Sequence, residues 1–381
     1  MLDIDRVTSK SDQNTTKMEA KASSTEPVVS IDPDGDLILR VGAALDDKDG
    51  PISYRVCSSA LRRASPVWKA MLFGPWREAR PANECEPWRV ELPEDSPRHL
   101  CVLLDIIHGN FSSVPEKPAT IDDLACILEI TDKYELAPSI QPWASGWATM
   151  LRAPQTQRFH PYDPKMAHCI VNHIQKASAA WRLGCEEVFS QEAQAFLFNS
   201  KLSEPQGSET SVLMVSCGDP QPLSDILGTG LDDFEEVIAE LRLALIQNML
   251  DFYHDQVSRR TQDTSSCRVG SQWDRLMCDT AVLGSITRRT IRLNLGPFHK
   301  SAKDAWNMTP NTLLEHLSLL FRDIPPIHHS HHQCVVGREF DKFHTEICED
   351  KRWSDVLKPH HKKRLAAQRK ITGVSDSGEG S

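Results

Sequence analysis

Two short segments with alternating apolar and polar residues do most to limit how this chain can fold. In DLILRVG (36–42), Leu37, Leu39 and Val41 point to one face and the residues between them to the other. The same alternation returns in ISYRV (52–56), after the turn-forming residues of ALDDKDGP. β-Favouring residues at a period of two predict strands. A turn rich in Asp and Gly predicts that the two strands pair as a hairpin.

Helix start signals follow the hairpin in close succession. Ser65 before Pro66 and Ser96 before Pro97 both place an N-cap residue ahead of a proline at the first helical position. Thr120 predicts another helix start, with Asp123 in its first turn, where a carboxylate suits the helix dipole. WRVELPED (88–95) predicts a third strand between these helices. The expected order is strand, strand, helix, helix, strand, helix, helix, with a last helix near WASGWATML, which makes the fold class α+β.

Composition excludes several classes of function. The chain has 381 residues and a formal net charge of −10, which argues against a broad nucleic-acid surface. No apolar run approaches the roughly 20 residues that a membrane-spanning helix needs, and MLDIDRVTSKSDQNTTK has no apolar core typical of a secretory signal. The eleven cysteines follow no regular framework, so we expect reduced thiols in the nucleus or cytoplasm.

Changes in composition predict how the chain is divided. A long helix is expected over 231–257, where an apolar stripe favours packing in a helical bundle over a coiled coil. The full expectation is a disordered arm (1–30), a first domain (31–151), a linker (152–165), a helical segment (166–200), a flexible insertion (201–230), a helical C-terminal region (231–370) and a disordered tail (371–381).

The first domain resembles the BTB/POZ family in the form common in fungal proteins. The resemblance rests on DLILRVG, YRVCSSALRRASPVWKAM, VELPEDSPRHLCVLLDIIHGN and IDDLACILEITDKYEL, which stand in the family's order and spacing. The segments 177–198 and 278–298 are similar to the helical region that accompanies this domain in fungal proteins. The resemblance implies a BTB/POZ fold, a small mixed sheet capped by a helical bundle, followed by an all-α C-terminal region.

The resemblance also implies an association surface. In the family, the opening strand and the first helices form a dimer interface, so homo- or hetero-dimerisation is expected. The matching candidates are Asp36, Leu37, Leu61, Trp68 and Met71. The alternative is that the apolar members only fill the core of the single chain, because core and interface share the same apolar pattern.

A second implied contact is with a cullin scaffold of ubiquitin ligases. BTB adaptors that recruit cullins often carry an apolar-x-acid motif after the helix that follows the third strand, and Val114 and Glu116 stand at the matching place. An apolar contact and one acid suit a helical groove with a basic residue. A plain loop with the turn chemistry of PEKP is the alternative.

Histidine and cysteine residues gather near the C-terminal end. HHSHHQC (328–334) precedes two further candidates, and imidazole and thiolate are zinc ligands. Because the segment contains no CxxC pair and adjacent histidines cannot all face one ion, we expect no metal and no cofactor. The candidate ligands, were a site present, are His331, His332, Cys334, His344 and Cys348.

These observations favour an interaction protein and not an enzyme. The chain has no GxSxG and no HExxH motif. The leading hypothesis is an adaptor or scaffold that associates through the BTB-like domain, with a ubiquitin-ligase substrate adaptor as one version. A nuclear transcriptional co-regulator is the alternative, with the basic run KPHHKKRLAAQRK (358–370) as an import signal or as a solvated helix end. A metal-dependent enzyme that uses the His/Cys cluster is the second alternative.

Overall fold

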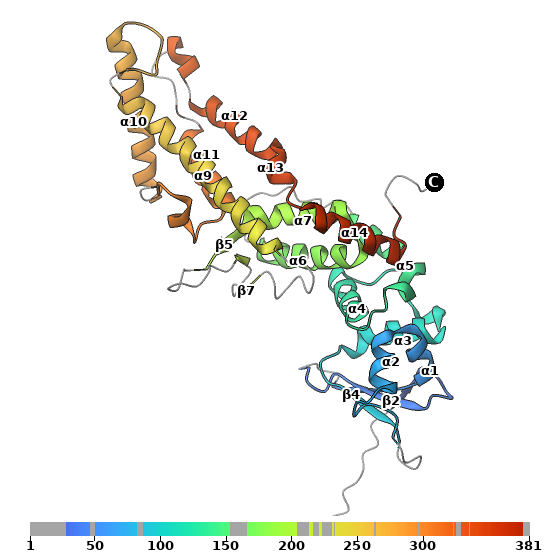
Figure 1. Ribbon diagram of the computed structural model, residues 1–381. Helices are drawn as coiled ribbons and strands as arrows, with labels where there is room; N and C mark the ends of the chain where they lie inside the picture. Colours follow the sequence, from blue (N-terminus) through green and yellow to red (C-terminus); the bar gives the residue numbers. More distant parts are fainter. Residues whose placement is uncertain are drawn as a thin grey trace, which may run out of the picture.

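The computed structural model shows an elongated α+β molecule with a small sheet at one end and a long helical region beyond it (Figure 1). It describes residues 28–45, 50–81, 87–152, 166–203, 213–215, 221–222, 231, 233–262, 264–295, 298–322, 324, 329–334 and 336–375. Within this part of the chain, no helix is both long and apolar enough to cross a membrane.

A mixed four-stranded sheet forms the first layer, in the order β1-β3-β2-β4. Its strands are β1 (Val28–Ser30), β2 (Leu37–Val41), β3 (Ile52–Val56) and β4 (Arg89–Leu92). β2 and β3 pair antiparallel, as the hairpin predicted, while β1 joins β3 and β4 joins β2 in parallel. The prediction of a disordered arm over 1–30 was therefore wrong for residues 28–30, because their backbone pairs with β3; residues 1–27 lie outside the described part.

Five helices complete the N-terminal module, and Figure 1 shows the first three on one side of the sheet. They are α1 (Ser58–Ala64), α2 (Pro66–Phe73), α3 (Pro97–His108), α4 (Ile121–Lys133) and α5 (Gln141–Arg152), with short 3-10 turns η1 (Phe111–Ser113) and η2 (Ala137–Ile140). The predicted caps are confirmed at α2, where the Ser65 hydroxyl accepts from the Trp68 amide, and at α4, where Thr120 and Asp123 form a capping box. At Ser96 the helix starts as predicted, but its side chain makes no capping hydrogen bond.

The helical region packs directly on this module. It begins with α6 (Met166–Leu183) and α7 (Glu186–Asn199), and α6 lies against α4, so that one apolar core runs through both parts. The expected linker does not separate two cores; its residues 153–165 lie outside the described part. The remaining helices are α9 (Phe234–Thr261), α10 (Gln272–Arg292), η3 (Ala302–Ala305), α11 (Pro310–Phe321), η4 (His329–Cys334), α12 (Val336–Glu349), α13 (Lys351–Ser354) and α14 (Pro359–Thr372).

The long helix predicted over 231–257 is confirmed as α9, which packs against α7, α10 and α11 as a bundle helix. An all-α C-terminal region was wrong, because part of the expected flexible insertion forms a small antiparallel sheet. Its strands are β5 (Ser200–Leu202), β6 (Leu213–Val215) and β7 (Gln221–Pro222). The sheet is anchored because Leu202 and Leu213 are buried and the Leu202 amide donates to the Trp306 carbonyl over 2.9 Å.

The chain end returns to the N-terminal module. The Thr372 hydroxyl donates to the Leu183 carbonyl over 2.8 Å, and Gln141 donates to the Ile371 carbonyl over 2.7 Å. Val374 is also buried. The disordered tail predicted for 371–381 was therefore wrong for residues 371–375, whose backbone and side chains dock on α5 and α6; residues 376–381 lie outside the described part.

Candidate functional site

Three of the five predicted interface residues belong to the core of the single chain. Leu37, Leu61 and Trp68 have no exposed surface. The Trp68 indole stacks on the Tyr134 ring, with 4.4 Å between the ring centroids. A side chain that is fully covered in one chain has no surface to offer a partner, so the core alternative holds for these three and their assignment to the interface was wrong.

The other two predicted interface residues have different roles. Asp36 accepts hydrogen bonds of 2.8 Å from both the Ser58 amide and the Ser58 hydroxyl, so it caps the start of α1. Met71 is partly exposed on α2. Of the apolar candidates, Met71 alone has surface available to a partner.

Exposed aromatic side chains lie just beyond Met71, at the end of α2. Phe73 is 40% exposed and Trp76 is 61% exposed. The Arg62 guanidinium lies 4.8 Å from the centre of the Phe73 ring, and the Trp88 ring meets Phe73 edge-on at 6.0 Å. We call Met71, Phe73 and Trp76 the α2 aromatic patch; the sequence analysis missed its two aromatic members because it followed the buried face of the helix.

The predicted cullin motif is divided between core and surface. Val114 is buried, whereas Glu116 is exposed. The exposed apolar group of this loop is Phe111, which is 60% exposed and lies 5.6 Å from the Trp143 ring of α5. Val114 was therefore wrong as the partner-binding residue, because its side chain fills the module core.

The predicted metal candidates separate into two groups. His331 and Cys334 in η4 lie beside two cysteines from elsewhere in the chain, Cys267 and Cys278. His344 and Cys348 lie together on α12, away from that cluster. His332 belongs to η4, but its side chain lies outside the described part.

The first group is a compact cluster of one imidazole and three thiols. The Cys267 sulfur lies 3.4 Å from His331 Nδ1 and 3.5 Å from the Cys334 sulfur, and Cys334 Sγ lies 3.9 Å from His331 Nδ1. The Cys278 sulfur completes the set, and all four atoms lie within 4.8 Å of one another. Cys267, Cys278 and His331 are buried and Cys334 is partly buried. We call these four residues the Cys₃His cluster.

Hydrogen bonds fix the loop that supplies Cys267. One carboxylate oxygen of Asp279 accepts from the Ser265 hydroxyl and from the Ser266 amide, the latter over 2.8 Å. The Val269 amide lies 3.4 Å from the Cys267 sulfur, to which it donates. Burial, together with the neighbouring thiols of Cys267 and Cys334, raises the pKa of Cys278 to about 12.

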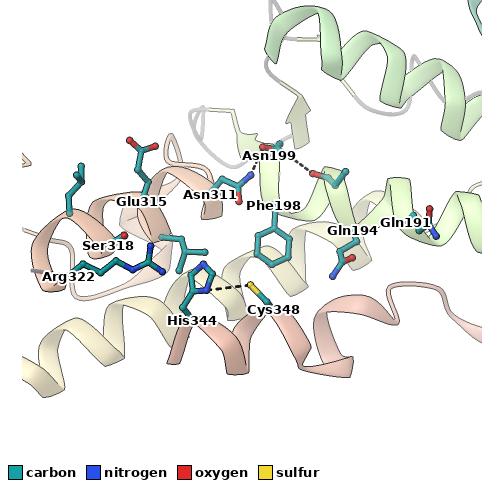
Figure 2. Close-up of a pocket in the computed structure, with 13 residues that line it drawn as sticks. Gln191, Gln194, Phe198, Asn199, Asn311, Glu315, Ser318, Arg322, His344 and Cys348 are labelled. Atoms are coloured by element: carbon teal, nitrogen blue, oxygen red, sulfur yellow. Dashed lines mark hydrogen bonds between the residues drawn. The ribbon is translucent and has the colours of Figure 1, made fainter. Parts of the chain in front are cut away.

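The second group lies in a pocket of about 570 Å³ between α7, α11 and α12 (Figure 2). His344 Nδ1 and the Cys348 sulfur are 3.9 Å apart. Burial, followed by the nearby Arg322, lowers the pKa of His344, and burial raises the pKa of Cys348. The pair is then a neutral imidazole and a neutral thiol, which lacks the thiolate that a cysteine nucleophile requires.

Two of the amides in the pocket wall, those of Asn199 and Asn311, are held in internal contacts. Asn311 donates to the side-chain oxygen of Asn199 over 2.7 Å, and Asn199 donates to the Ala195 carbonyl over 2.8 Å. Arg322 is paired with Asp341 at 3.1 Å. These contacts join α7 to α11 and α11 to α12, so the polar wall holds the bundle together.

Two buried charged groups were not singled out from the sequence. Glu192 of α7 pairs with His173 and, at 3.0 Å, with Lys176, both on α6. Arg242 of α9 has no exposed surface and donates to the carbonyls of Ser200, Ala305, Trp306 and Met308. Burial lowers the pKa of Arg242 to about 10. Glu192 joins α7 to the helix before it, whereas Arg242 joins elements that are distant in sequence. A single charge in an amphipathic stretch predicts neither role.

The basic run 358–370 forms α14 and is held against the chain. Lys358 pairs with Asp233 at 2.9 Å and Lys362 with Asp355 at 2.7 Å, while His361 and Leu365 are buried. Lys363 and Arg364 are exposed. The run is therefore not simply a solvated helix end, because one side of α14 packs on the chain while Lys363 and Arg364 lie on its exposed side.

Comparisons with known proteins found no relative of this chain. No family model, no curated protein and no solved structure matches this chain.

Proposed function

We propose that this chain is an interaction protein whose N-terminal module, BTB/POZ-like in its sequence, associates with a second copy or a related module through the α2 aromatic patch. The observation that carries the proposal is the exposure of Phe73, the last residue of α2, and of Trp76, three residues beyond it. This is the part of the module where the family resemblance implies an association surface.

Exposed aromatic surface has an unfavourable free energy in water, which association removes. Tyr, Trp and Phe are enriched in protein interfaces because each one buries a large rigid area with few rotatable bonds. Interface residues that contribute most to binding are often tryptophans surrounded by polar groups. Arg62 and Arg77 flank the patch as such polar groups, both exposed.

The experiment measures the mass of the full chain by multi-angle light scattering across a range of concentrations. We expect a dimer for the native chain and a monomer for the double variant Phe73→Ser, Trp76→Ser. Trp273→Ser is the matched control, because Trp273 is 68% exposed on α10, outside the module, and its loss should leave the dimer intact.

A monomer at every concentration, together with no protein captured by proximity labelling in the native cell, contradicts the proposal. A dimer that survives the double variant also contradicts it, because association then uses another surface.

A ubiquitin-ligase adaptor is the version of this function that a second observation favours. Glu116 and Phe111 place an exposed acid and an exposed aromatic ring on one loop before α4. The Trp147 indole donates to the Pro115 carbonyl over 3.5 Å and holds this loop on α5. The combination suits a cullin groove that takes an apolar side chain and pairs a basic residue with the acid.

For this version, we expect a cullin in a pull-down with the native chain and its loss with Glu116→Lys. Glu94→Lys is the charge-matched control, because Glu94 is exposed in the turn after β4. Equal cullin recovery with both variants overturns the adaptor version and leaves the association proposal standing.

A further inference from the structure

We propose that Cys267, Cys278, His331 and Cys334 form a closed, structural zinc site that clips η4 to the start of α10. The inference is independent of the proposed association function, because α10, which carries Cys278, lies at the opposite end of the molecule from the sheet (Figure 1).

Three of the four ligand atoms are spaced like one face of a tetrahedron around one ion, and the fourth, Cys278 Sγ, lies within 4.8 Å of each of them. With Zn–S near 2.3 Å and Zn–N near 2.05 Å, tetrahedral angles place two sulfurs about 3.8 Å apart and a sulfur and a nitrogen about 3.5 Å apart. The observed separations are 3.5 Å for Cys267 to Cys334, and 3.4 Å and 3.9 Å from these sulfurs to His331 Nδ1. Three thiolates and one imidazole are a common ligand set of structural zinc.

The same distances exclude a disulfide as the explanation for the cluster. A disulfide needs its sulfurs about 2.05 Å apart, and Cys267 and Cys334 are 3.5 Å apart. One disulfide also leaves a third thiol and the imidazole nitrogen turned toward the same point. Simple apolar packing does not account for the set either, because His331 directs a ring nitrogen at the sulfurs from a buried position.

The surroundings supply what a metal-bound thiolate needs. The Val269 amide donates to the Cys267 sulfur, a contact that stabilises negative charge on sulfur. Asp279 holds the backbone of Ser266 and Cys267 through its carboxylate and so orients the ligand loop from the second layer. Soft thiolate and imidazole ligands in tetrahedral arrangement favour zinc over calcium or magnesium, which take oxygen ligands.

Four protein ligands fill a tetrahedral site and leave no position for water or substrate. Catalytic zinc sites keep such a position open, so the cluster stabilises the fold. The ion would join three segments: the loop before α10 through Cys267, α10 itself through Cys278, and η4 through His331 and Cys334. This linkage fixes η4 and, through it, the start of α12.

The experiment determines the metal content of the full chain, purified without a polyhistidine tag so that no added ligand competes. Inductively coupled plasma mass spectrometry should find one zinc per chain. Exchange of the ion for Co²⁺ should give the intense visible bands of tetrahedral cobalt and a thiolate-to-cobalt charge-transfer band in the near ultraviolet.

Matched variants locate the ion. Cys334→Ser and His331→Ala should each reduce zinc to a small fraction of the native content, whereas Cys348→Ser and His344→Ala, a second cysteine and histidine on neighbouring turns, should retain one zinc per chain. His331→Cys should also retain the metal, because four thiolates are an equally common zinc set.

A native chain that is folded and free of zinc after purification overturns the proposal, as does an octahedral cobalt spectrum. Full zinc content in Cys334→Ser overturns it too. The native metal content and cobalt spectrum decide the question even if a variant fails to fold.

Discussion

The N-terminal module and the far end of the helical region are stabilised in different ways. In the module, large apolar side chains such as Trp68 and Trp147 are completely buried. At the other end, every residue from 271 to 277 is exposed, and α10 buries only Cys278, Asp279, Val282 and Ile286. We call residues 264–279 and 329–334 the distal tip.

This difference explains why a cluster of metal ligands would be placed at the tip. Full burial of one large apolar side chain contributes roughly 1.5–3 kcal/mol, and the module has many such side chains. The tip has few, and its loop and 3-10 segment have little intrinsic stability. A single ion that joins three segments substitutes for an apolar core that so short a stretch cannot build.

Removal of metal should produce the largest difference in stability between the two regions. We expect a high-affinity chelator to abolish amide hydrogen-exchange protection in the distal tip and to leave the module unchanged. The effect is the largest expected here, because structural zinc binding in small domains is coupled to about 10–16 kcal/mol of apparent free energy. Mass spectrometry of the exchanging chain resolves both regions in one experiment.

Readdition of zinc to the chelated chain should restore protection in the tip. If chelation instead exposes the module, or if the tip stays protected, then the two regions do not differ in the way described.

Truncation of a core side chain tests the module instead of the distal tip. Trp68→Ala should lower the free energy of unfolding by about 3–5 kcal/mol, because it removes a fully buried indole and its stack on Tyr134. Denaturant unfolding measures the change. Zinc content of the folded variant should remain at one per chain, because α2 lies beside the sheet and α10 lies at the other end of the molecule (Figure 1).

The control for this variant is Trp273→Ala in α10. An indole that is 68% exposed should cost no more than about 0.5 kcal/mol when removed. Equal destabilisation by the two variants would mean that the tip depends on apolar contacts as much as the module does.

The sequence predicted the module well because its signals are local. Alternation in β2 and β3, the Ser65-Pro66 pair and the Thr120–Asp123 capping box each act within a few residues, and each appears where expected. The edge strand β1 and residues 371–375 were missed, because both are ordered by contacts with distant segments: β3 in one case, α5 and α6 in the other.

Only half of the Cys₃His cluster was predicted from the sequence, for the same reason. His331 and Cys334 stand three residues apart and were among the candidates, whereas Cys267 and Cys278 are supplied by a loop and helix more than fifty residues upstream. The other candidate ligands predicted from the sequence were His344 and Cys348, which follow the histidine-rich segment HHSHHQC. The available signal was a Cys-x10-Cys pair followed later by a His-x2-Cys pair, and only the fold brings the two pairs together.

The smallest expected effect comes from removing the same type of helix cap in each of the two regions. Ser65→Ala and Ser271→Ala each remove a hydroxyl that accepts from an amide in the first turn, of α2 and α10 respectively. Loss of an N-cap costs about 0.5–2 kcal/mol. Ser65 should lie at the upper end, because its buried hydroxyl also donates to the Tyr134 carbonyl over 2.6 Å.

The two variants should also differ in what they destabilise. Ser65→Ala should lower the free energy of global unfolding, since α2 lies in the cooperative core. Ser271→Ala should leave that value within about 0.5 kcal/mol and speed hydrogen exchange only in the first turn of α10. A zinc ion bound at Cys278 explains this expectation, because it holds the second turn of α10 and confines fraying to the first turn. Faster exchange across all of α10 after Ser271→Ala would therefore show that the turn is not held at Cys278.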